Sequence, residues 1–81
     1  MIGIAILKTD GSTERIYCEP ENVLKTLQGA VGGYIEIVTG ICPPDYLCIV
    51  NEDGLRLQLE PNPYAPHIVG DIALIKAEHM E

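Results

Sequence analysis

Runs of apolar residues along this chain predict several β-strands and a single helix. Residues 2–7 are almost continuously apolar and β-branched, which is typical of a strand covered on both faces. Residues 13–19 alternate instead, which places Ile16 and Cys18 on one face and Arg15 and Tyr17 on the other. An Asp-Gly turn joins these two runs, so they predict an antiparallel hairpin in which residues 2–7 form the interior strand.

The single helix is predicted from Pro20 to Val31. Proline suits the first helical position because its missing N–H would have no helical partner there. Gly29 weakens this helix by about 1 kcal/mol relative to alanine, which indicates either a close approach of the sheet or a loose last turn. Gly32 and Gly33 are expected to end the helix, one of them in the left-handed conformation. The apolar stripe of this helix consists of Val23, Leu24, Leu27 and Val31.

Four further strands are expected after the helix, at residues 34–39, 46–50, 55–59 and 71–77. The first of these is expected to be central, with Ile35 and Ile37 pointing inward. Leucines alternate with polar residues in 55–59, which predicts a half-exposed strand. A tight hairpin connection with Gly54 in the left-handed position should precede it. Residues 61–66 carry three prolines and are expected to be irregular.

These elements predict an α+β domain with the order β-β-α-β-β-β-β. The architecture would be a mainly antiparallel sheet with one helix packed on one face. We expect a single domain over residues 1–77, followed by a polar tail at 78–81. One helix cannot cover both faces of six strands, so the sheet should curl or meet a partner subunit. This predicts a homo-oligomer.

The composition restricts the classes of partner. The chain has 81 residues, and its four tyrosines are the only aromatic residues, so the core must be aliphatic. A single core of this size supplies roughly 3–5 kcal/mol of net stability. Because small domains often gain further stability by association, this also favours an oligomer. The net charge is −7 and the five basic residues are dispersed, which disfavours nucleic acid and anionic membranes as partners. No apolar run approaches the roughly 20 residues that a bilayer requires.

The three cysteines are an odd number in a chain that shows no export signal. This predicts free thiols and a cytoplasmic location. Five residues separate Cys42 from Cys48, which is wider than the usual spacing of zinc ligands. His67 and Asp71 could belong to a nucleophilic site, but no serine or cysteine is suitably spaced. We therefore expect no metal, no cofactor and no catalysis.

Several short motifs follow one another between the helix and the last strand: LQ at 27–28, VGGYIE at 31–36, NEDG at 51–54, Leu59, Asn62 and VGD at 69–71. Together they resemble a small domain-of-unknown-function family found in phage, plasmid and prokaryotic proteins. The resemblance covers residues 23–75 and implies no catalytic residues. The occurrence of the family on mobile elements suggests a role at the boundary between phage and host.

Six residues are candidates for a ligand site: Gly33, Tyr34, Glu36, Asn62, Tyr64 and His67. Gly33 could present a backbone N–H, although the dipole at a helix C-terminus has the wrong sign for an anion; its other role is helix termination. Glu36 could accept hydrogen bonds from a ribose or an amide, or it could pair with an arginine, either Arg15 or Arg56. Asn62, between two prolines, could recognise a base or an amide, or it could satisfy the loop backbone.

Two functions of different classes follow. The first is a non-catalytic, oligomeric small-ligand binder with pockets at subunit junctions, which on a phage would sequester a nucleotide-derived immune signal of the host. The second is a protein-interaction module, an acidic inhibitor or adaptor of a host protein. The salt dependence of binding distinguishes these two functions. A protein contact driven by charge weakens as the ionic strength rises, whereas binding in an enclosed ligand site does not.

Overall fold

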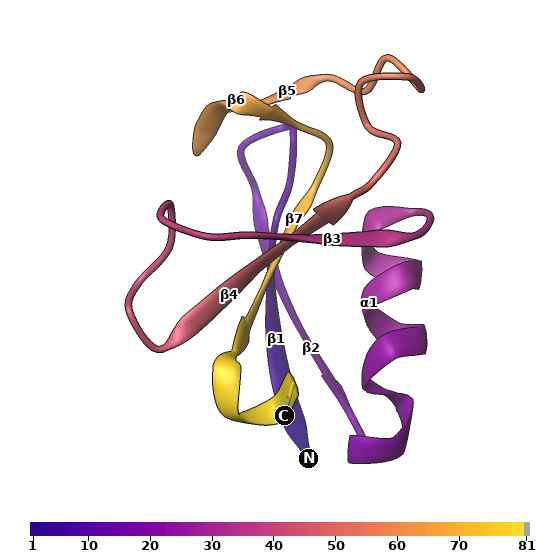
Figure 1. Cartoon of the computed structure of the whole chain (residues 1–81), viewed down its shortest axis with the longest axis vertical. Helices are drawn as coiled ribbons and strands as arrows, with labels where there is room; N and C mark the ends of the chain where they lie inside the picture. Colours follow the sequence, from indigo (N-terminus) through magenta and orange to yellow (C-terminus); the bar gives the residue numbers. More distant parts are fainter. Residues whose placement is uncertain (81) are drawn as a thin grey trace.

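A computed structural model describes residues 1–80 and places five strands in one antiparallel sheet (Figure 1). The strand order in this sheet is β2-β1-β7-β4-β3. Its strands are β1 (Ile2–Leu7), β2 (Thr13–Cys18), β3 (Ile35–Val38), β4 (Tyr46–Asn51) and β7 (Ile72–Lys76). The other elements are η1 (Pro20–Asn22), α1 (Val23–Val31), β5 (Pro61–Asn62), β6 (Ala65–Val69) and η2 (Ala77–Met80). The α+β class and the mainly antiparallel sheet with its helix are confirmed.

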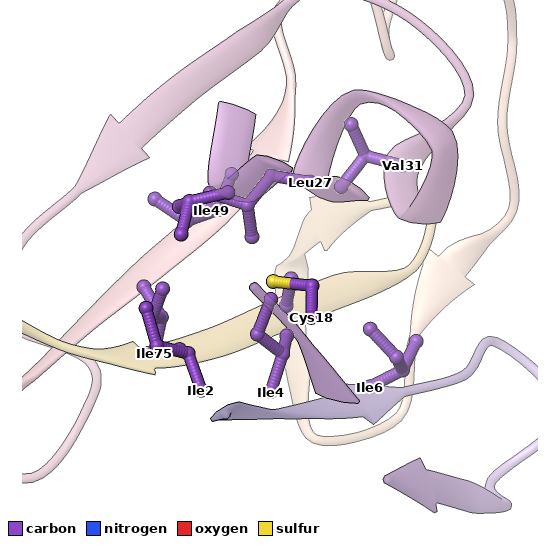
Figure 2. Packing of buried hydrophobic residues seen from close by; sticks show 10 residues of the cluster. Ile2, Ile4, Ile6, Cys18, Leu27, Val31, Ile49 and Ile75 are labelled. Atoms are coloured by element: carbon purple, nitrogen blue, oxygen red, sulfur yellow. The ribbon is translucent and has the colours of Figure 1, made fainter. Parts of the chain in front are cut away.

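Helix α1 lies on one face of the sheet and buries its apolar stripe there (Figure 2). Leu27 points toward Ile49 of β4 in this view, and the isoleucines of β1 stand on the same face. Leu24, predicted in the stripe, is instead 55% exposed. Each fully buried aliphatic side chain contributes roughly 1.5–3 kcal/mol, so this layer is the main source of stability. The fully buried residues of the layer are Ile4, Leu27, Ile49, Ala73 and Ile75.

The helix ends at the two glycines, as predicted. Gly32 is left-handed, with φ +81°, and its N–H donates to the carbonyl of Gln28 at 2.9 Å. Asn51 at the end of β4 donates its side-chain amide to the carbonyl of Val31 at 3.0 Å. This bond satisfies a carbonyl that has no partner within the helix and fastens the helix end to the sheet.

The opposite face of the sheet is covered in part by chain that is not helical. Ile41 and Cys42, in the loop between β3 and β4, pack there against the second core cluster. Ala65 and Ile68 of β6 pack against the same cluster, whose sheet residues are Cys48, Val50 and Ile72. The chain therefore closes part of the face that the helix leaves uncovered. The remaining part, over β1 and β2, stays open.

Strand β3 lies at an edge of the sheet, and the prediction that it is central was wrong. The central position belongs to β7, which pairs with β1 on one side and β4 on the other. Its apolar sequence suits burial on both faces. Glu36 and the 47%-exposed Ile37 suit an edge instead. Ile35 does pack against the main core, as predicted.

Residues 55–59 do not form the predicted strand. Local turns take up the backbone groups, as in the bond from the N–H of Leu57 to the carbonyl of Asp53 at 2.9 Å. Leu55 and Leu57 are therefore 81% and 49% exposed. Gly54 is not left-handed; Gln58 takes a positive φ of 57° in this segment instead. A Cβ at Gly54 would lie 2.9 Å from the Val69 side chain, so close packing explains that glycine.

The proline-rich segment is more regular than predicted, because β5 and β6 pair with each other there. Proline is tolerated in such a two-stranded ribbon, where one edge of each strand needs no donor. The C-terminal residues predicted as a polar tail include part of η2 (Ala77–Met80), whose Met80 packs against the main core. The last residue of that tail, Glu81, lies outside the described residues.

Candidate functional site

Two of the open hollows on the side of the sheet that faces away from α1 differ in the charge of their lining. The larger, which we call the basic trough, has a volume of about 540 Å³. It is lined by Gly3, Ala5, Arg15, Tyr17, Pro43, Tyr46, Leu74, Lys76, Glu78 and His79. The second, which we call the acidic groove, has a volume of about 350 Å³. It is lined by Glu36, Val38, residues 50–56 and residues 67–69.

The register of the sheet explains why the basic trough is hollow. Gly3 of β1 pairs with Tyr17 of β2, and Ala5 pairs with Arg15. Because glycine and alanine have almost no side chain, β1 forms a low floor beside larger residues. A Cβ at Gly3 would lie 3.3 Å from the Tyr17 ring and 3.4 Å from the Arg15 guanidinium. These two groups therefore lean over the floor. Lys76 and Tyr46, an antiparallel pair of β7 and β4, line the other side.

Positive charge in this acidic chain gathers in the trough. Of the five basic residues, Lys8 and Arg56 each lie within ion-pair distance of a carboxylate. Arg15 and Lys76 both line the trough, and neither forms an ion pair with another residue in the range 1–80. His79 at the rim lies 4.0 Å from Glu78. Two cations without internal partners thus share one hollow.

These side chains are suited to a ligand that carries both an anionic group and a planar ring. A guanidinium presents a fork of donors that matches a phosphate or carboxylate, and an ammonium adds a point charge. Tyr17 is 58% exposed and offers a ring face for stacking. Within residues 1–80, no group of three His, Cys, Asp or Glu side chains is placed to hold a metal ion.

The acidic groove runs beside the edge strand β3. Arg56 there binds the Asp53 carboxylate at 3.1 Å. Glu36 and Glu52 also line the groove, and neither forms an ion pair with the other described residues. Glu36 therefore does not form the ion pair with Arg15 or Arg56 that was one of its two possible roles. Val38, Val50, Leu55, Ile68 and Val69 supply the apolar lining.

The six candidate ligand residues are divided among different places. Glu36 and His67 lie together in the acidic groove. Gly33 donates its N–H to the carbonyl of Gln28 at 3.1 Å, which is the bonding of a helix terminus. Tyr34 is 70% exposed beside the edge strand. The hollows thus bring together only two of the six.

Asn62 and Tyr64 fasten the β5–β6 ribbon to the rest of the chain. Asn62 is completely buried, and its amide nitrogen donates to the carbonyls of Leu7 at 2.9 Å and Gly70 at 3.0 Å. Its oxygen accepts from the N–H of Tyr64 at 2.9 Å. The Tyr64 hydroxyl donates to the carbonyl of Gly11. Of the two roles considered for Asn62, the structure therefore shows the second, in which its amide satisfies backbone groups.

The residues of the basic trough were missed by the sequence-based prediction. The alternation of residues 13–19 does place Arg15 and Tyr17 on one face, and that signal was present. Tyr46 and Lys76 come from strands far away in the chain, and only the pairing of β7 with both β1 and β4 brings them alongside. The Asp71 carboxylate accepts from the N–H of Thr9 at 3.0 Å, and His67 lies in the acidic groove.

Comparisons with known proteins identify a family. No helix within residues 1–80 has the length and apolar character needed to span a bilayer. No curated protein and no solved structure matches the chain. One family model, described as Domain of unknown function (DUF3846), matches residues 4–81, which is nearly the whole chain. The chain therefore belongs to the DUF3846 family, a family of unknown function.

Proposed function

We propose that this protein binds, without turning it over, a small anionic ligand that carries a planar ring, and that it does so in the basic trough. The observation that supports this most is the presence of both Arg15 and Lys76 in one hollow of a chain whose net charge is −7. Arg15 and Lys76 form no ion pair within residues 1–80, although the Glu78 carboxylate lines the same hollow, so both cations are available to an external anion.

The two tyrosines of the trough suggest the rest of the ligand. Tyr17 and Tyr46 line opposite sides of the floor formed by Gly3 and Ala5. An aromatic ring in this position stacks on a planar base, and such stacking contributes roughly 1–3 kcal/mol per base. A mononucleotide combines a base with a phosphate, so it is the simplest ligand of this chemistry. The volume of about 540 Å³ lies within the range of small-molecule sites.

Binding without turnover is sufficient for sequestration. For a member encoded on a phage or plasmid, we propose a nucleotide-derived immune signal of the host cytoplasm as the ligand. The trough is built from one chain, so this proposal does not need pockets at subunit junctions. A homo-oligomer remains a separate expectation, and its subunits would have to leave the trough accessible, because the trough lies on the part of the sheet face that the chain leaves open.

Isothermal titration calorimetry with AMP tests the proposal. We expect AMP to bind more tightly than adenosine or inorganic phosphate, because each of these supplies only half of the contacts. Arg15→Gln and Lys76→Gln should each weaken AMP binding by about tenfold, the size of one lost charge-assisted hydrogen bond. Lys25→Gln removes the same kind of charge from an exposed position of α1 and serves as the matched control.

Either of two outcomes contradicts the proposal. The first is equal affinity of the wild-type protein and the Arg15→Gln and Lys76→Gln variants for AMP. The second is no heat of binding with AMP, ADP-ribose or any cyclic dinucleotide at millimolar concentration. Thermal unfolding of each variant shows whether the fold is retained, and a loss of affinity counts only where it is.

A further inference from the structure

The edge strand β3 presents backbone groups that have no partner in the sheet. The N–H of Glu52 donates to the carbonyl of Tyr34 at 2.9 Å, one step before the first β3–β4 pair. Hydrogen-bonded and non-bonded pairs alternate along an antiparallel ladder. Even-numbered residues such as Glu36 therefore direct their backbone groups toward β4. Ile35 and Ile37 direct their N–H and C=O groups outward.

This edge lacks several of the devices that prevent further pairing, although the strand has four residues and carries one charge, on Glu36. Proteins commonly protect edge strands with lysine, proline or a bulge. The sequence of β3, Ile-Glu-Ile-Val, contains no lysine or proline, and its register with β4 is regular. Ile37 is 47% exposed, and Tyr34 just before the strand is 70% exposed. The edge is thus both open and apolar on the helix side.

The two faces beside this edge differ in character. On the side away from the helix lies the acidic groove, where Glu36 and Glu52 have no ion-pair partner within residues 1–80. On the helix side lies Ile37. Because side chains alternate along a strand, a segment added to β3 would direct every second residue toward the groove and the others toward Ile37. Directly opposed side chains of adjacent strands stabilise the pairing when they carry opposite charges or are both apolar.

We propose that β3 and the acidic groove bind an extended segment of a partner protein in which basic and aliphatic residues alternate. The segment adds to the sheet by strand pairing, and its backbone bonds to Ile35 and Ile37. Its lysines or arginines face Glu36 and Glu52 and lay their alkyl stems along the apolar groove. A second copy of this chain fits less well, because each copy carries a net charge of −7 and would bring further carboxylates to the groove.

The probe for this proposal is a capped peptide, acetyl-Lys-Val-Lys-Val-Lys-Val-amide, followed by amide hydrogen exchange of the full chain. We expect the amides of Ile35 and Ile37 to become protected on addition of the peptide, whereas acetyl-Glu-Val-Glu-Val-Glu-Val-amide leaves them unprotected. Glu36→Lys should weaken binding of the lysine peptide by about tenfold. Glu21→Lys makes the same charge change at the far end of the helix and should leave the affinity unchanged.

Ile37→Pro separates backbone pairing from charge attraction. The outward N–H of Ile37 makes no bond to β4, so proline removes a donor to the partner while the β3–β4 ladder is kept. Ile37→Ala removes the same side chain and retains the donor. We expect the proline variant to bind the lysine peptide about tenfold more weakly than the alanine variant.

Three results would overturn the proposal: equal affinity of the Lys-Val and Glu-Val peptides, no protection of Ile35 and Ile37, or equal binding by Glu36→Lys and the wild-type protein. Protection of the same amides that grows with protein concentration in the absence of peptide would also overturn it, because a second copy would then occupy the edge. Arg15→Gln should bind the peptide normally, so this test is independent of the trough.

Discussion

Single buried asparagines determine how the less regular parts of this chain are held. Asn51 joins the end of α1 to β4, and Asn62 joins the β5–β6 ribbon to Leu7 and Gly70. An asparagine side chain can donate to two carbonyls and accept from one N–H at once. Asn51 and Asn62 therefore supply hydrogen-bond partners to backbone groups outside the regular strand pairs. The turn role of Asn51 was predictable from its neighbours. The burial of Asn62 was not, because it depends on strands that are distant in the sequence.

Removal of the Asn62 amide should be costly. Asn62→Ala leaves the carbonyls of Leu7 and Gly70 and the N–H of Tyr64 without their partner in the interior. We expect a loss of about 3 kcal/mol in the free energy of unfolding, measured by urea denaturation. Asn22→Ala is the matched control, because that side chain is exposed and makes no capping bond. A loss below about 0.5 kcal/mol for Asn62→Ala would contradict this role.

The thiol of Cys48 should make stability depend on pH in the alkaline range. Burial, reinforced by the neighbouring Cys42 thiol, raises the pKa of Cys48 from 9.0 to about 12. Well below pH 9 the thiol is protonated in both the folded and the unfolded chain, so it causes no pH dependence there. Between pH 9 and pH 12 the unfolded chain loses this proton first, so stability falls as the pH rises.

The check is a series of urea denaturation curves between pH 8 and pH 11. We expect the wild-type protein to lose more stability over this range than Cys48→Ala, which lacks the thiol but keeps every other side chain. Parallel loss of stability in the two proteins would show that Cys48 ionises as freely in the folded chain as in the unfolded one.

At the scale of elements, the helix and the strands with strong patterns were predictable, and the connections were not. The helix was found because proline at its start, two glycines at its end and an apolar stripe agree with one another. The strand predicted at residues 55–59 was wrong because leucines can also alternate with polar residues in turns that leave the leucine side chains exposed. The edge position of β3 could not be predicted, since strand order is set by pairing between distant segments.

The helix itself retains a weak position that can be improved. A Cβ at Gly29 would meet no atom within 4 Å, so the close approach of the sheet that we considered is absent. Gly29→Ala should therefore stabilise the protein by about 1 kcal/mol, because alanine has less backbone freedom to lose. Thermal or urea unfolding measures this change. Gly32→Ala, at the left-handed position, should instead destabilise, and stabilisation by both substitutions would contradict the helix boundary.

At the scale of the whole molecule, charge is sorted between two hollows on one side of the sheet. The basic trough collects Arg15 and Lys76, and the acidic groove collects Glu36 and Glu52. The composition predicted an acidic protein with dispersed basic residues, which is correct along the sequence. Folding brings two of those basic residues together through three neighbouring strands, β2, β1 and β7. That gathering depends on register, which is why the candidate site could not be predicted from spacing.

The central claim is that the basic trough holds an anionic, ring-bearing small molecule, and native mass spectrometry of protein purified from cells tests it most directly. The wild-type protein and an Arg15→Gln, Lys76→Gln double variant would be compared, and the same spectra give the number of subunits. We predict an added mass of nucleotide size on the wild-type chain that is absent from the folded double variant. A bare wild-type protein, or the same added mass on both proteins, would contradict the account.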